Sequence, residues 1–515
     1  MLMKLERQER KKAGLKQKLN SNYIWTFTTY FTEGFPYAMI RSVSAVFFRD
    51  MKAPLSFVGL TSLFGIPWIL KFLWGPWVDE FGTKRRWLVG MQAPLLVVFL
   101  AAAVFAPFGN NVYLIYGLFF IGSFIAASND TAIDGYYLEA LSKEDQSKFV
   151  GYRNMAYRLS WMCGTGVIVT LGATAGWPLA FLIAAVIFGL FVLYHLFFLP
   201  EIQVPEKRIG ILLARVFRFK VLAIILAILA AAIGIQYYFQ SPGYARLTER
   251  ISFLKKMELA HWAALLLLLA LILVGIFIKR FKQLLVKNPD SNYGKAFITF
   301  MDKEKIGVIL SFIILLRLGE WVLSNMVSPF IVDLGIKVHY GWISAGVGLP
   351  LSITGTMVGG WMIARYSLKR MIWPFILIQN FIHVFYTLLA VHLQPFVALN
   401  TGAAHPVPIG FANLIWVAGV NGFDQFAGGL GSSVLITYLM RICHKDHKAS
   451  HYAIGTGLMA IPAPFAGVFS GIIAGWLGYA WLFGISFVLA IPGMMLIPFL
   501  PYLSDEKLDM KGSTT

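Results

Sequence analysis

Acidic side chains inside long apolar stretches are the residues of this sequence that are best suited to chemistry. Asp130 and Asp134 stand one helical turn apart in the stretch 112–138, so both would lie on one face of a helix. Arg158 in the next stretch is expected at a comparable depth and could pair with either acid. Ionisable groups cost ~2.5–3.5 kcal/mol each inside a bilayer, so those present are expected to be paired or functional. Two carboxyl groups this close suit a site that loads and releases a proton, and a purely structural ion pair is the alternative.

Other polar residues at similar depth could bind a substrate or join a proton path. Arg317 and Glu320 are three residues apart and would partly neutralise each other on one helix. A polar strip at 421–425 could serve the hydroxyl groups of a sugar or hydrogen bonds between helices. Lys71 could line a cavity or extend its ammonium group to the membrane surface. The residues expected to bind substrate or couple protons are Glu33, Arg41, Lys71, Asp130, Asp134, Arg158, Arg317, Glu320, Asn421, Asp424 and Gln425.

The segment GPWVDEFGTKRR at 75–86 carries the strongest local signal. It resembles motif A of the major facilitator superfamily, a G-x-x-x-D-x-x-G-x-[KR]-[KR] loop, and the resemblance implies a latch at the inner gate. Its acid would meet a helix N-terminus, and its basic residues would pair with cytoplasmic carboxylates. A second copy from Gly360 has Ala364 in place of the acid, so only the first copy is expected to act as a full latch. The predicted gating residues are Gly75, Asp79, Gly82, Lys84, Arg85 and Arg86.

The elements that must position these residues are predicted to be membrane-spanning helices. Of the 515 residues, 58% are hydrophobic and only 13% are charged, whereas a soluble domain carries ~25% charged residues. The apolar stretches are long enough to cross ~30 Å of hydrocarbon as helices, which satisfy every backbone amide in lipid. We therefore predict an all-α membrane protein. The predicted helices cover residues 22–48, 56–78, 87–107, 112–138, 150–172, 177–199, 219–239, 259–278, 306–332, 342–364, 371–393, 409–440, 451–475 and 478–502.

The positive charge of the chain is arranged as a topology signal. The net charge is +19, and Lys and Arg gather in alternate loops between the predicted helices. The positive-inside rule then predicts that both termini are cytoplasmic, and the arrangement argues against a nucleic-acid partner. The first apolar stretch is too long for a cleavable signal and should remain as a span.

Cysteine and histidine usage predicts neither a disulfide nor a metal site. Cys163 and Cys443 are expected near the reducing side of the membrane, where disulfides are rare. His444, His447 and His451 have a metal-like spacing, but no further residue completes a tetrahedral set. No cofactor is expected either.

The chain repeats itself at an offset close to half its length. Glu33 and Glu320 occupy matching helices, as do the long stretches 112–138 and 409–440. Two related six-helix bundles in parallel orientation fit this pattern, with a substrate site between them near the midplane. The extra helix pair is either a regulatory hairpin or a lipid-facing linker. The predicted parts are a basic tail at 1–21, a first bundle at 22–199, a linker with two further helices at 200–305, a second bundle at 306–502 and a tail at 503–515.

Several short segments, taken in order, resemble the AmpG-type permeases. They are GFPYAM at 34–39, KFLWGPWVD at 71–79, SNDTAID at 128–134, AYRLSWM at 156–162, GGLGSS at 428–433, LMRICHK at 439–445 and ASHYAI at 449–454. The resemblance implies a bacterial inner-membrane permease that imports anhydro-muropeptides from the periplasm. Relatives that carry siderophores or acetyl-CoA are the alternative, and a membrane sensor is less favoured because mid-membrane charge occurs in both halves.

The energy source is expected to be an ion gradient. The sequence has no P-loop, and it has no H-E-x-x-H or G-x-S-x-G motif of an enzyme. We therefore expect proton-coupled transport by a monomer, with the bilayer, protons and a small sugar-peptide as partners.

Overall fold

The computed structural model describes residues 20–71, 74–106, 112–202, 241–242, 246, 257–269, 272–273, 292–403, 405–443 and 448–503. Every regular element in these ranges is a helix, which confirms the predicted all-helical class. The predicted helix at 219–239 lies outside the described residues.

The first half of the chain forms helical rods, some of which are broken into consecutive segments. The breaks include a π-helical turn in the first rod and another in the fifth. In chain order the elements are α2 (Asn22–Ala38), η1 (Met39–Val43), α3 (Ser44–Asp50), α4 (Leu55–Leu60), η2 (Thr61–Gly65), α5 (Ile66–Leu70), α6 (Gly75–Glu80), α7 (Lys84–Phe105), α8 (Val112–Ala140), α9 (Lys143–Met162), η5 (Cys163–Ile168), α10 (Val169–Ala175) and α11 (Trp177–Phe198).

The second half repeats this pattern. It also contains a π-helical turn, in the rod that follows the loop after Asp333. The elements are α16 (Asn292–Met301), α17 (Ile306–Asp333), η7 (Lys337–His339), η8 (Trp342–Gly348), α18 (Leu349–Tyr366), α19 (Leu368–Asn400), α20 (Phe411–Ile442), α21 (Lys448–Ala460), α22 (Pro462–Leu477), α23 (Tyr479–Met495) and η10 (Ile497–Phe499).

Among the described residues, eight helical segments are long and apolar enough to cross a membrane. They range from 21 residues at Tyr479–Phe499 to 33 residues at Leu368–Asn400. The predicted spans at 22–48, 56–78, 150–172 and 409–440 are not among the eight. In the structure the span at 22–48 is divided by a π-helical turn, and the span at 150–172 continues α9, which begins in a charged segment. The apolar helix within 56–78 is the shorter segment Leu55–Leu70.

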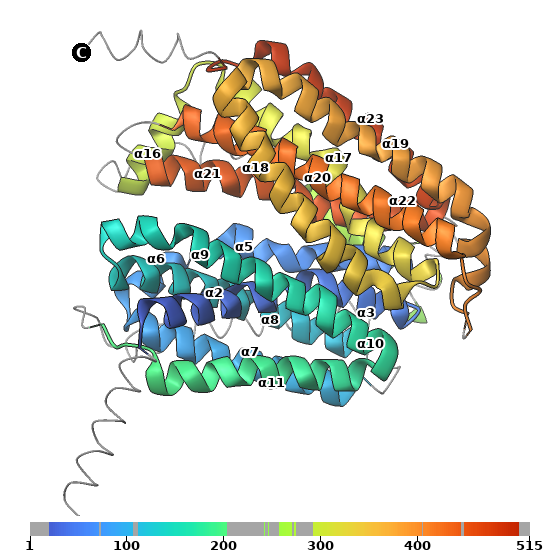
Figure 1. Ribbon diagram of the computed structural model, residues 1–515, viewed down its shortest axis with the longest axis horizontal. Coiled ribbons are helices and arrows are strands. Elements are labelled where there is room, and N and C mark those ends of the chain that lie inside the picture. Colours follow the sequence, from blue (N-terminus) through green and yellow to red (C-terminus); the bar gives the residue numbers. More distant parts are fainter. Residues whose placement is uncertain are drawn as a thin grey trace, which may run out of the picture.

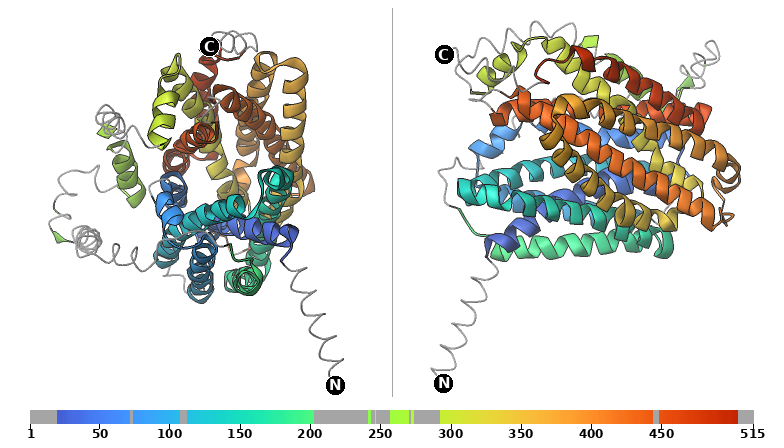
Figure 2. Two further views of the ribbon diagram at one scale, coloured as in Figure 1. Left: turned by 90° about the vertical axis from the view of Figure 1, so that its left-hand side faces the viewer. Right: turned by 45° about the horizontal axis from the view of Figure 1, so that its top comes forward.

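The two halves of the chain form two layers of helices that lie against each other (Figure 1). The blue-to-green helices of the first half pair as α7 with α8 and α2 with α9, and the yellow-to-red helices of the second half pair as α18 with α20 and α17 with α23. Figure 2 shows the same two groups from two further directions. We call the end that holds α3 and α10, at the right of Figure 1, the seam end, and the end that holds α6 and α16 the terminal end.

The hydrophobic core is shared by the halves at the seam end and divided at the terminal end. One cluster contains Phe47 and Phe181 from the first half and Phe330 and Phe483 from the second. Towards the terminal end, the cluster around Tyr438 belongs to the second half, and a separate cluster around Tyr136 and Trp25 belongs to the first. The two halves are therefore joined mainly at the seam end.

Glycine allows the two halves to approach closely at this end. A side-chain carbon added to Gly59 of α4 would lie 2.5 Å from the carbonyl oxygen of Gly467 in α22. Nearby, the Ser62 hydroxyl donates a hydrogen bond of 2.9 Å to the carbonyl oxygen of Pro464. Any larger residue at Gly59 would force the helices apart.

Part of the central insertion also lies at the seam end. Its described segment, the helix Leu259–Leu269, buries Ala260 and Ala264 in the shared core. Glu258 accepts a hydrogen bond from Ser56 of α4, and the ring of His261 stacks on Trp476 of α22 with 5.2 Å between centroids. The insertion therefore contacts both halves as well as presenting leucines outward.

Candidate functional site

A cavity of about 380 Å³ lies between the two halves. We call it the central cavity. It brings together five of the residues singled out in the sequence, namely Arg41, Glu320, Asn421, Asp424 and Gln425. Tyr37 and Trp161 from the first half and Trp321 from the second add aromatic walls.

Arg41 reaches the central cavity from a distorted turn of the first rod. It lies in the π-helical segment η1, a kind of turn that often occurs at functional sites. Its Nη1 atom donates a hydrogen bond of 2.7 Å to the carbonyl oxygen of Ser62. Gly65 makes room for the guanidinium group, because an added side-chain carbon there would lie 3.0 Å from Nη1.

The second half contributes the acidic wall of the cavity. Glu320 pairs with Arg317 at 3.0 Å, as their spacing predicts, and accepts a 2.7 Å hydrogen bond from Gln379. Asp424 accepts a 3.3 Å hydrogen bond from the side-chain amide of Gln425. The predicted polar strip therefore faces the cavity.

Asn421 and Trp321 present unpartnered polar atoms beside this wall. The Asn421 amide donates to the Tyr386 hydroxyl at 3.2 Å, but its buried Oδ1 atom has no hydrogen-bond partner in the described structure. The indole nitrogen of Trp321 is likewise buried without a partner. Each atom therefore lacks the partner that a buried polar group normally has.

A second group of charges lies within the first half. Lys71 forms an ion pair with Asp130, which is buried. The carboxyl group of Glu33 lies close to Asp130 and Asp134, and one of its oxygens is buried without a hydrogen-bond partner in the described structure. The ammonium group of Lys71 thus points into the first half and does not extend to the membrane surface.

Asp134 has a different partner from the one that the sequence predicted. It accepts a 3.0 Å hydrogen bond from the Tyr30 hydroxyl and lies 3.7 Å from the guanidinium group of Arg153. Arg153 also donates to the Tyr30 hydroxyl at 2.8 Å and lies over the ring of Tyr137. Arg158 forms no ion pair within the described part of the chain. The prediction that Arg158 pairs with either acid is therefore wrong.

The reason is the rotation of one helix. Arg153 and Arg158 are five residues apart, so their side chains point about 140° away from each other around the helix axis. The pairing of α9 with α2 and the position of Tyr30 turn Arg153 towards Asp134. Only this packing, and not the depth of a residue in the membrane, decides which arginine reaches the acid.

The loop 75–86 is held within the first half. Gly82 has a φ of 70°, which favours glycine. Lys84 is buried, donates to the carbonyl oxygen of Val78 at 2.8 Å and lies 3.6 Å from Glu139. Arg85 donates to the carbonyl oxygen of Leu196 at 2.8 Å, where a carboxylate was expected. The side chain of Asp79 lies outside the described residues, so its predicted contact with a helix N-terminus stays a prediction.

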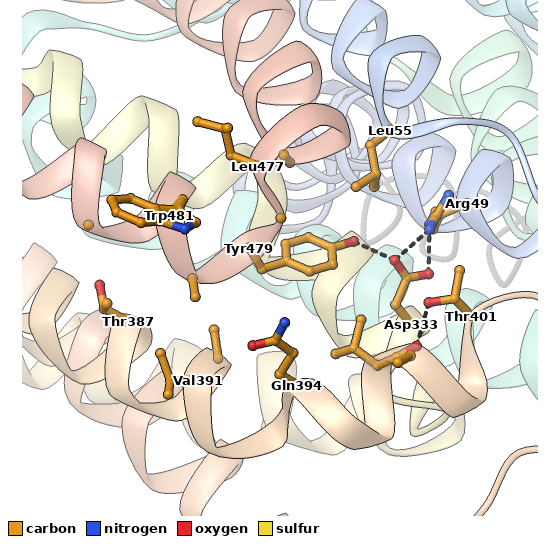
Figure 3. A pocket seen from close by; sticks show the side chains of 17 residues that line it. Arg49, Leu55, Asp333, Thr387, Val391, Gln394, Thr401, Leu477, Tyr479 and Trp481 are labelled. Carbon is orange, nitrogen blue, oxygen red and sulfur yellow. Dashed lines mark hydrogen bonds and ion pairs between the residues drawn. The ribbon is translucent and has the colours of Figure 1, made fainter.

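The sequence reasoning missed a set of ion pairs that joins the halves at the seam end. Arg49 forms a two-pronged pair with Asp333, with both contacts at 2.6 Å, and Tyr479 donates to the same carboxylate at 2.6 Å. Figure 3 shows this group at one end of a cavity of about 680 Å³ that α19 and α23 line.

A second pair lies nearby at the seam end. Lys337 pairs with Asp50 at 2.6 Å, and the Trp177 indole donates to Asp50 at 2.7 Å. We call these two ion pairs the seam pairs. Charged residues at the ends of the apolar stretches were their only signal in the sequence.

Two further tryptophans and the histidines that were considered for a metal site lie outside the central cavity. Trp68 packs edge-on against Tyr37, with 4.8 Å between ring centroids, and Trp74 donates to Ser128. His451 shares a 2.9 Å hydrogen bond with Thr299, and His444 and His447 lie outside the described residues. Within the described ranges no three metal-ligating side chains come together.

Known proteins resemble this chain over most of its length. The anhydromuropeptide permease of Escherichia coli (strain K12) is 23% identical over 479 residues, which cover 91% of this chain and 77% of the permease. A protein of Rickettsia conorii named putative transporter AmpG 4 is 21% identical, covering 91% of this chain and 93% of its own. These similarities agree with the AmpG-type resemblance of the short segments.

Solved structures and a family model address the fold. The crystal structure of a peptide transporter POT in complex with sulfate superposes with a TM-score of 0.61 at 12% identity, covering 93% of this chain and 94% of the other. At that identity the likeness shows the fold alone. The model of the Major Facilitator Superfamily matches residues 26–300, more than half of the chain. The chain therefore belongs to the Major Facilitator Superfamily.

Proposed function

We propose that the protein is a secondary transporter that imports anhydro-muropeptides across the bacterial inner membrane. The observation that carries the proposal is the central cavity, which residues of both halves line with charged, polar and aromatic side chains. Transporters of this family bind substrate between their halves and expose it to alternate sides by rocking one half against the other. The similarity to the anhydromuropeptide permease of Escherichia coli supplies the substrate class. Sugar rings and carboxylates suit the aromatic walls and Arg41, respectively.

We assign the helical rods to two six-helix bundles, residues 22–199 and 306–502, joined by an insertion at 200–305 that carries two further helices. The distribution of Lys and Arg supports a cytoplasmic terminal end, with the tails 1–21 and 503–515 in the cytoplasm. The seam end is then periplasmic. Its shared core and ion pairs support an inward-facing state, in which the periplasmic side is closed. A monomer suffices, because one chain supplies the whole cavity lining.

The loop 75–86 is proposed to latch the cytoplasmic side when the periplasmic side opens. Motif A loops of this family act in that way, and Asp79 would supply the contact to the opposite half. In the inward-facing state the basic residues bind within their own half, as Lys84 and Arg85 do.

Proton coupling is proposed for the carboxyl groups inside the first half. Glu33 lies close to Asp130 and Asp134, and carboxyl groups that are close together favour a proton on one of them. Lys71 neutralises Asp130 and Arg153 neutralises Asp134, which leaves Glu33 as the carboxyl group without a cation of its own. We therefore assign the proton to Glu33.

Uptake into proteoliposomes tests the proposal. The purified protein is reconstituted, and uptake of radiolabelled anhydro-muropeptide is followed with an imposed inward proton gradient, without one, and with a protonophore. We expect labelled anhydro-muropeptide to accumulate inside the proteoliposomes above its external concentration only when the proton gradient is imposed. Protein-free liposomes are the control. Uptake no greater than in that control would contradict the substrate, and equal uptake with and without the gradient would contradict the coupling.

A further inference from the structure

The central cavity holds two opposite charges that have no ion-pair partner in the described part of the chain. Arg41 on the first half contacts only a backbone oxygen, that of Ser62, among the hydrogen bonds of its guanidinium group. Asp424 on the second half accepts one long hydrogen bond, from Gln425. By contrast, the third charge in the lining, Glu320, has both Arg317 and Gln379 as partners.

Uncompensated charges in a cavity between packed helices are costly. A charged group removed from water needs a counter-charge or several hydrogen bonds. Both charges are half-buried, and both line the same space of about 380 Å³. A ligand that carries a negative and a positive group would compensate both, whereas a neutral sugar would compensate neither. A simple anion would suit Arg41 and be repelled by Asp424.

The unpartnered polar atoms on the second half point to a ligand as well. The buried Oδ1 atom of Asn421 requires a donor, and the buried indole nitrogen of Trp321 requires an acceptor. Leaving such a group unpaired is costly, so each favours a bound partner. Asn421 lies one turn before Asp424 on α20, which places an acceptor next to the carboxylate. An ammonium group, which only donates, fits that pair.

We propose that the central cavity recognises a zwitterionic ligand, whose carboxylate binds Arg41 and whose amine binds Asp424 and Asn421. The inference rests on the proposed function and narrows it. In an anhydro-muropeptide the peptide portion, which carries carboxylates and the amine of a diamino acid, occupies this part of the cavity. The rings of Tyr37 and Trp161, with 5.5 Å between their centroids, line the cavity together with Arg41. They can pack against an apolar group or the face of a sugar ring. The ligand thereby bridges the two halves.

Binding to the purified protein in detergent tests the proposal with three probes. They are an anhydro-muropeptide whose peptide ends in a diamino acid, the same compound with its amine acetylated, and the same compound with its carboxylates amidated. Each modification is expected to weaken binding at least tenfold. Equal binding of the parent and the acetylated probe would overturn the inference while leaving the proposed function intact. Failure of the parent itself to bind would contradict the proposed function.

Single substitutions test which residue binds the amine of the ligand and which binds its carboxylate. Asp424→Asn should abolish the preference for the free amine and keep the preference for the carboxylate. Arg41→Gln should do the reverse. Glu201→Gln, which removes an exposed acid outside the cavity, is the matched control and should change neither preference. An amine preference that survives in Asp424→Asn would overturn the assignment, and the comparison of probes on the unaltered protein decides the matter if that variant does not fold.

Discussion

Four of the ion pairs in the described part of the chain fall into two groups that differ in what they connect. The pairs Lys71–Asp130 and Arg153–Asp134 lie inside the first half. The seam pairs, Arg49–Asp333 and Lys337–Asp50, connect residues of different halves. If the halves rock as rigid bodies, the first group persists through the transport cycle and the second must break in every cycle.

The hydrophobic core follows the same division. Each half keeps its own cluster towards the terminal end, while one cluster crosses between the halves at the seam end. Opening the seam end therefore exposes apolar surface as well as charges. This comparison predicts that variants of the first group lose folded protein, whereas variants of the second group fold and change their conformational balance.

The largest effect is expected from Asp130→Asn. The substitution removes the counter-charge of Lys71, whose side chain is 33% exposed. Asp130 itself is buried in the helix packing, and breaking a pair with a buried member costs up to ~3–5 kcal/mol. Size-exclusion chromatography of a fluorescent fusion should show a large loss of monodisperse protein. The double variant Lys71→Met/Asp130→Leu should recover folding but not transport. A yield of monodisperse protein equal to that of the native protein in Asp130→Asn would show that folding does not depend on this pair.

Asp333→Asn is expected to shift the conformational balance without loss of folding. It removes the counter-charge of Arg49, which is 10% exposed, and opening the seam end lets water reach the guanidinium group. Hydrogen bonds to charged groups contribute about 1.5–3 kcal/mol, so the open state should become at least tenfold more populated.

The measurement for this variant is labelling of a single cysteine in the central cavity. Ser328→Cys lines the cavity, and Cys163 and Cys443 are first replaced by serine. With the proposed periplasmic position of the seam end, a membrane-impermeant maleimide added to spheroplasts reaches this cysteine only when the seam end opens. An unchanged labelling rate in Asp333→Asn would separate the Arg49 pair from the gate.

A smaller effect is expected where the insertion touches the first half. Ser56→Ala removes the hydrogen bond to Glu258 but leaves Ala260 and Ala264 in the shared core. A single hydrogen bond contributes about 1 kcal/mol, so the same labelling rate should rise about fivefold. Val338→Ala, an exposed position near the seam end, serves as the control. A rate equal to that of the control would leave the insertion as a linker only.

Lys337→Gln should have the smallest effect. Its side chain is 33% exposed, and Asp50 keeps the hydrogen bond from Trp177. Exposed ion pairs contribute 0–1 kcal/mol, and salt screens them, so labelling should rise only a few-fold at low salt and not at all at high salt. An effect as large as that of Asp333→Asn would show that both seam pairs hold the gate equally.

The sequence predicted what depends on local spacing. Arg317 and Glu320, three residues apart, form the expected ion pair. Asp130 and Asp134, four residues apart, both lie near Glu33. Prediction from the sequence failed where partners come from elsewhere in the chain. Arg49 and Asp333 are 284 positions apart, and no periodicity links them. The choice of Arg153 over Arg158 depends on the rotation of α9, which its packing against α2 decides.

We propose that a carboxyl group inside the first half carries the proton while the cavity between the halves holds the substrate. The most direct test compares gradient-driven accumulation with counterflow in Glu33→Gln, because glutamine mimics a carboxyl group that stays protonated. Exchange of labelled for unlabelled anhydro-muropeptide needs no net proton movement. We expect Glu33→Gln to exchange substrate at close to the native rate and to lose gradient-driven accumulation of substrate. Native accumulation in Glu33→Gln would contradict this proposal.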